Sequence, residues 1–78
     1  MNENIIKRRN RQIGVSQCIL EGMTLKEAGE EYGISAKTVA RDIKQLALVG
    51  YGTTKEQIEQ NKILAYKALE EIERRKGL

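Results

Sequence analysis

The sequence predicts a small all-α domain with a central pair of short helices and a long C-terminal helix. No proline occurs among its 78 residues, so no position removes a backbone donor from a helix interior. Most of its seven glycines stand between segments whose apolar residues recur three and four positions apart, which is the helical period. The only aromatic residues are three tyrosines, so we expect one modest aliphatic core.

A first helix is expected over Asn10–Glu21, with Gly22 ending it. The face expected to cover the apolar side of the motif carries Ile13, Gln17 and Leu20 at helical spacing, with Val15, Cys18 and Ile19 beside them. A dense basic run precedes this helix; its cations are Lys7, Arg8, Arg9 and Arg11. This run can lie along a phosphate backbone, or it can be the solvated start of the helix or a mobile arm.

The second helix is expected to begin at Thr24, where a capping box is spelled by Thr24 and Glu27. Its one-sided apolar stripe consists of Leu25, Ala28 and Tyr32. Gly33 follows the last of these residues, at the position where a helix commonly ends in a left-handed residue. Gly29 weakens the helix, so we expect its missing side chain to allow close contact with the third helix.

The third helix is expected to be capped by Ser35, with Ile34 filling the turn before it. Its apolar stripe consists of Val39, Ile43 and Leu46. The opposite face carries cations among small residues, with Asp42 as the single counter-charge; its members are Ala36, Lys37, Ala40, Arg41 and Lys44. The outer face of the preceding helix is net acidic, so the two neighbouring helices differ in sign.

A loop around Tyr51, flanked by Gly50 and Gly52, separates this helix from the last one. Capping boxes at Thr53 or Thr54 predict a long helix over about residues 54–76. Its apolar stripe consists of Ile58, Ala65, Leu69 and Ile72, broadened by Leu64 and Ala68. Tyr66 is expected to be partly buried against the motif. The helix ends in a second basic cluster of Arg74, Arg75 and Lys76, in which Glu70–Arg74 and Glu71–Arg75 have the i,i+4 spacing of ion pairs.

Two short helices joined by a tight turn, at residues 24–46, are typical of a DNA-binding helix-turn-helix. The second helix of such a motif lies in the major groove, so Lys37 and Arg41, with Lys44, are expected near base edges beside the small Ala36 and Ala40. Ser35 and Thr38 at its start are expected at phosphates. Because one helix reads only a few base pairs, both basic clusters are candidates for additional backbone contacts.

The block T-L-K-E-A-G-E-E-Y-G-I-S-A-K-T-V-A-R-D-I resembles the helix-turn-helix of the stage III sporulation protein D family of small bacterial regulators. Ile13-Gly14 upstream, and Ile72, the basic cluster and Gly77 downstream, lie in similar places, so the resemblance covers most of the chain. It departs at Ala28-Gly29 and in a longer loop after the first helix. The resemblance implies a sequence-specific transcriptional regulator in the bacterial cytoplasm, associated with the nucleoid, whose basic C-terminal end reaches toward the minor groove.

Other features narrow the function class. There is no histidine, and Cys18 is the only cysteine, so the usual general base and the common zinc spacings are missing. We therefore expect no enzyme, metal or cofactor, and a Cys18 that is a small helix residue in a reducing compartment. No apolar run is long enough for a membrane span, and no signal-peptide pattern precedes the domain.

Two alternatives to a DNA-binding regulator stay open. The helix-turn-helix can serve as a protein-interaction module or dock on RNA polymerase, since a fold alone does not fix function. The chain can also be an assembly protein of a phage or mobile element that oligomerises through its C-terminal helix. We expect a monomer, because the apolar residues of that helix suffice to cover the motif once; a dimer would require a pseudo-palindromic site.

Overall fold

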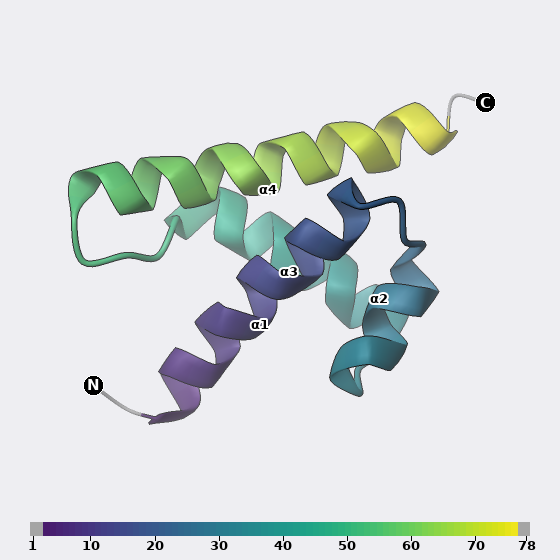
Figure 1. Ribbon diagram of the computed structural model, residues 1–78, viewed down its shortest axis with the longest axis horizontal. Helices are drawn as coiled ribbons and strands as arrows, with labels where there is room; N and C mark the ends of the chain where they lie inside the picture. Colours follow the sequence, from purple (N-terminus) through teal and green to yellow (C-terminus); the bar gives the residue numbers. More distant parts are fainter. Residues whose placement is uncertain (1–2, 77–78) are drawn as a thin grey trace.

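The computed structural model describes residues 3–76, and these form four helices without a strand. They are α1 (Glu3–Leu20), α2 (Leu25–Tyr32), α3 (Ala36–Val49) and α4 (Lys55–Lys76). The long α4 lies across the top of the view in Figure 1, α1 crosses below it, and α3 lies behind both. α1 and α3 each pack against the other three helices. The predicted all-α fold with a long C-terminal helix is confirmed.

The first helix begins seven residues before the predicted start, at Glu3 rather than Asn10, so the basic run is helical and not an arm. Glu3 lies in the first turn, where a carboxylate complements the helix dipole, and it pairs with Lys7 at 3.8 Å. Gly77, which the resemblance included, lies outside the described residues.

The predicted inner face of α1 was right in part, because Val15, Cys18 and Ile19 are buried and Ile13 packs against the core. The residues that point into the core are Gln12, Val15, Ser16, Cys18 and Ile19, while Gln17 and Leu20 are exposed. Two polar side chains occupy this face, and each forms a hydrogen bond there. Ser16 donates its hydroxyl to the Gln12 carbonyl at 2.8 Å, and the Gln12 amide donates to Gln45 at 2.9 Å.

The turns follow local chemistry closely. Both halves of the Thr24 capping box are present, and Gly33 ends α2 with a φ of 68°. The Ser35 hydroxyl accepts from the Thr38 amide at 3.1 Å and begins α3, and Gly50 ends that helix. The motif from Thr24 onward therefore has the predicted helix–turn–helix geometry.

Two glycines inside helices have packing reasons. Gly29 lies close to the turn and to Ser35 at the start of the third helix; a side chain there would collide with the Ile34 carbonyl. Gly14 lies under the Tyr32 side chain, and a side chain at Gly14 would overlap the tyrosine hydroxyl. Both glycines therefore let α2 and its turn come close to their neighbours.

The core joins all four helices. Its buried apolar residues are Val15, Cys18, Ile19, Ala28, Val39, Ile43, Leu46, Ala47, Ala65, Ala68 and Ile72. The small Ala65 and Ala68 let α4 approach closely, which agrees with the predicted stripe. Tyr66 was predicted to be partly buried but is 53% exposed, because residues 65, 68 and 72 occupy the inward face of α4.

The start of α4 combines parts of the two predicted capping boxes. The Thr54 hydroxyl accepts from the Gln57 amide at 3.1 Å, as in the second box. The Gln57 side-chain oxygen accepts from the Thr53 amide at 2.9 Å instead of the Thr54 amide. Both threonines therefore take part in fixing the first residue of the helix at Lys55.

Candidate nucleic-acid interface

The outer face of α3 carries a row of cations. Lys37, Arg41 and Lys44 are exposed, whereas Val39, Ile43 and Leu46 on the opposite side have no accessible surface. No ion pair or hydrogen bond joins these three cations to other residues in the described part of the chain. Ala36 and Ala40 beside them are half-buried and add little bulk. The face is therefore positive, with small residues between its cations.

α3 continues one turn past the predicted end of the motif, to Val49. Leu48 continues the spacing of Lys37, Arg41 and Lys44, and it is 77% exposed. Sequence reasoning stopped at Leu46 and missed this residue. The signal was present in the spacing, because positions 37, 41, 44 and 48 share one helical face.

Asp42 does not counter the cations of this face. It is only 3% exposed, and Arg11 of α1 donates to both of its carboxylate oxygens, from Nε at 2.7 Å and from Nη2 at 3.0 Å. The Gln12 amide lies 3.4 Å from the same carboxylate. The negative charge is thus turned inward and neutralised, so the outer face of α3 is more basic than the sequence indicates.

Ser35 and Thr38 stand at the start of α3. Beyond the cap, their two hydroxyls lie 2.9 Å apart. Ser35 is exposed and Thr38 is half-buried. Because the first amides of a helix point outward with partial positive charge, this end of α3 is suited to an anion.

The four cations of the N-terminal basic run make different contacts. Arg8 and Arg11 line a groove between α1 and α3 together with Arg41. Arg9 turns away and stacks its guanidinium over the Tyr51 ring, 4.8 Å from the centroid. Lys7 pairs with Glu3 at the surface. The structure thus brings two of the four predicted cations beside α3.

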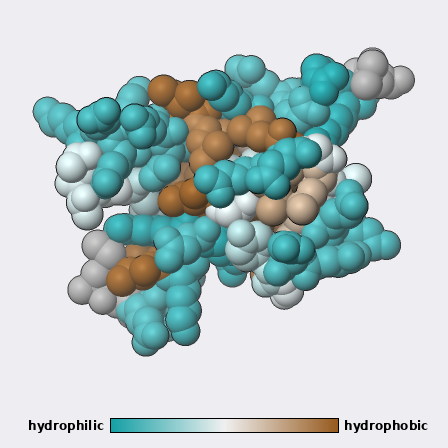
Figure 2. Space-filling view, in the orientation of Figure 1, coloured by the Kyte–Doolittle hydropathy of each residue, from teal (hydrophilic) through white to brown (hydrophobic). Residues whose placement is uncertain are grey.

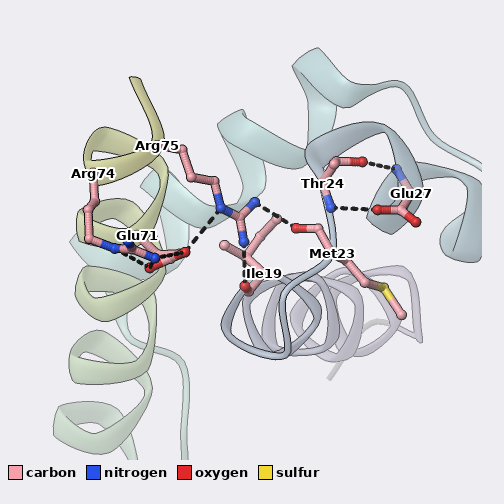
Figure 3. A network of polar contacts seen from close by, with 7 residues as sticks. All are labelled: Ile19, Met23, Thr24, Glu27, Glu71, Arg74 and Arg75. Atoms are coloured by element: carbon pink, nitrogen blue, oxygen red, sulfur yellow. Dashed lines mark hydrogen bonds and ion pairs between the residues drawn. The ribbon is translucent and has the colours of Figure 1, made fainter. Parts of the chain in front are cut away.

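The C-terminal cluster contacts the end of α1 and the loop that follows it. Arg75 donates to the Met23 carbonyl at 2.7 Å and to the Ile19 carbonyl at 2.9 Å, and its Nε lies 3.1 Å from Glu71 (Figure 3). The two carbonyls belong to the end of α1 and the loop after it. Arg75 therefore fastens the end of α4 to that loop.

The other two cations of this cluster are exposed. Arg74 pairs with Glu71 at 2.6 Å instead of the predicted Glu70, and Lys76 pairs with Glu73 at 3.5 Å. Hydrogen bonds from Arg74 and then Arg75 hold the pKa of Glu71 below its ordinary value. The cluster is therefore partly balanced by carboxylates of its own helix, unlike the face of α3.

The remaining polar chemistry is structural. A backbone hydrogen bond from Thr24 lowers the pKa of Glu27 in the capping box, and burial raises the pKa of the Cys18 thiol. Within residues 3–76, no three histidine, cysteine or acidic side chains gather as metal ligands do. None of the helices in this same range is long and apolar enough to cross a bilayer.

No family model matches the chain, and neither the curated proteins nor the solved structures contain a match to it.

Proposed function

We propose that this chain binds double-stranded DNA with α3 in the major groove and acts as a bacterial transcriptional regulator. The observation that carries the proposal is the outer face of α3, which presents Lys37, Arg41 and Lys44 exposed and without an ion pair to another residue of the described part. Arginine and lysine are the commonest readers of guanine edges, and unpaired surface cations attract the phosphate backbone.

The neighbouring surfaces agree with this orientation. The outer face of α2 bears Glu30 and Glu31, which are exposed and would be repelled by phosphates. α1 presents Arg8 on the side next to α3. DNA that approaches α3 from its cationic side would meet further positive charge from Arg8 of α1.

Arg41 gives the direct test, because it is exposed and forms no ion pair with another described residue. Sites selected from random duplexes would first define the preferred sequence. Arg41→Ala should then cost about 1–3 kcal/mol of binding free energy and relax the preference at one position, while leaving the fold intact. Glu30→Ala is a matched control on the acidic face and should not weaken binding. Equal affinity and equal preference for Arg41→Ala would reject the assignment.

A second candidate function, protein interaction or assembly, is favoured by one observation. Ile63 and Tyr66 on α4 remain exposed, at 46% and 53%. Figure 2 shows apolar atoms at the surface along the middle of α4. The expectation of a monomer assumed that little of α4 is left for a partner, and these residues weaken that premise. Light scattering at micromolar concentration, with Ile63→Glu as the variant, would test self-association separately from DNA binding.

A further inference from the structure

The groove between α1 and α3 is a distinct basic site. It has a volume of about 270 Å³ and is lined by Arg8, Arg11, Thr38, Arg41, Asp42 and Gln45. The lining contains three guanidinium groups and one carboxylate. α1 supplies two of the guanidiniums and α3 supplies the third, so the site exists only because the two helices pack side by side.

The charges of this groove do not cancel. Arg11 and Asp42 satisfy each other through two hydrogen bonds, at 2.7 and 3.0 Å. Arg8 and Arg41 have no polar partner among residues 3–76. Two guanidiniums therefore remain free to donate, and planar guanidinium groups match the oxygens of a phosphate in bidentate geometry.

We propose that this groove receives one backbone phosphate of the bound DNA, with Arg8 as its donor, and that Arg11 is a positioning residue that neutralises Asp42. The proposal rests on the proposed function and specifies which arginine of α1 contacts the phosphate and which one neutralises Asp42. Arg41 forms the opposite wall, and its side chain reaches on toward the base edges. Without Arg11, the carboxylate of Asp42 would face the groove and repel the same phosphate.

The role of Arg8 can be isolated with its neighbour Lys7 as a matched control. Both are exposed cations of α1, but only Arg8 lines the groove. On a selected duplex, Arg8→Ala should weaken binding to all sequences and lower the slope of log K against log salt by about 0.9, the value for one phosphate contact. Lys7→Ala should change the slope less. Equal slopes for the two variants would overturn the proposal.

A neutral backbone substitution identifies the phosphate. We would use a set of duplexes in each of which one backbone phosphate is replaced by an uncharged methylphosphonate. At one replacement position, the affinity of the wild type should fall by nearly the factor by which Arg8→Ala weakens binding to unmodified DNA. At that position Arg8→Ala should lose nothing further. Independent losses at every position would overturn the proposal. If the wild-type chain binds none of the duplexes, the proposed function itself fails, and this outcome is distinct from the others.

A rescue experiment tests the positioning role of Arg11. Arg11→Met should weaken DNA binding, and Arg11→Met with Asp42→Asn should recover it, because the repelling charge is gone. Circular dichroism would confirm that the double variant is folded. If Arg11 itself contacts DNA, the double variant would stay weak with a reduced salt slope, which overturns its assignment. Inorganic phosphate can also be added to the DNA-free protein. If it stabilises the wild type but not Arg8→Ala, the ligand of the groove is a free phosphate and not a backbone phosphate, which overturns the proposal.

Discussion

The basic run near the N-terminus and the basic end of α4 carry similar charge but serve different parts of the molecule. In the first, Arg11 reaches across to α3 and binds Asp42, and Arg8 stays free beside the cationic face. In the second, Arg75 binds the carbonyls of Ile19 and Met23, and its exposed neighbours pair with Glu71 and Glu73. Charge alone does not distinguish a binding cation from a structural one; its partners do.

The difference also concerns where the charge can act. Arg8 and Arg11 of the N-terminal run line a groove with Arg41 of α3, whereas Arg75 and Lys76 lie next to the start of α2 around Thr24 and Leu25. Arg8 lines the groove beside α3 with Arg41, so we propose that Arg8 is the basic side chain outside α3 that adds most to binding.

The largest expected effect is on stability and comes from Arg11→Met. The substitution leaves the nearly buried Asp42 carboxylate without its cation, so the free energy of unfolding should fall by about 3 kcal/mol. Urea denaturation followed by circular dichroism would measure it. Combining it with Asp42→Asn should restore most of the loss, and a double variant as unstable as the single one would contradict the mechanism.

Arg75→Met should have the next largest effect. It removes two hydrogen bonds from a charged donor to backbone carbonyls, and we expect a loss of about 1–2 kcal/mol in unfolding free energy. The salt slope of DNA binding should not change, because Arg75 is committed to the fold. Arg74→Met serves as the control and should cost less than about 0.5 kcal/mol, as exposed ion pairs usually do. A reduced salt slope in a stable Arg75→Met protein would move this residue to the DNA surface.

Acid should loosen the C-terminal end through Glu71. Its pKa is lowered in the folded chain by hydrogen bonds from Arg74 and Arg75, so the stabilisation is present above the ordinary value of 4.5 and is lost as pH falls through the folded value. The melting temperature of wild type should exceed that of Glu71→Gln at pH 7, and this difference should shrink as the pH falls below 4.5. A difference that is constant with pH would exclude the ionised carboxylate as its cause.

The smallest effect is expected from Arg74→Ala combined with Lys76→Ala. Both side chains are exposed, and both are paired with carboxylates of α4. The salt slope of DNA binding should fall by less than the roughly 0.9 of one phosphate contact. A fall in the slope that corresponds to two phosphate contacts would place Arg74 and Lys76 on the binding surface, as the family resemblance implies. The two basic ends would then no longer differ in function.

The sequence by itself determined the starts of α2 and α3 and the inward face of α3. Thr24 with Glu27, and Ser35 with Thr38, bond across three residues, so their partners are already set by spacing. The stripe of Val39, Ile43 and Leu46 is fixed by the helical period in the same way. These features need no knowledge of other elements, and the candidate cations of α3 follow from them as the opposite face.

Tertiary structure decided which polar residues are inside and what each cation binds. Asp42 meets Arg11 across 31 positions, and Arg75 meets Ile19 across 56. Gln12 is buried, and its amide donates to Gln45 of α3. Tyr66 is exposed because Ala65 and Ala68 face the core, and Tyr66 lies on another side of α4. A long side chain can reach several elements, so its partner depends on how the helices pack, and no local spacing encodes that.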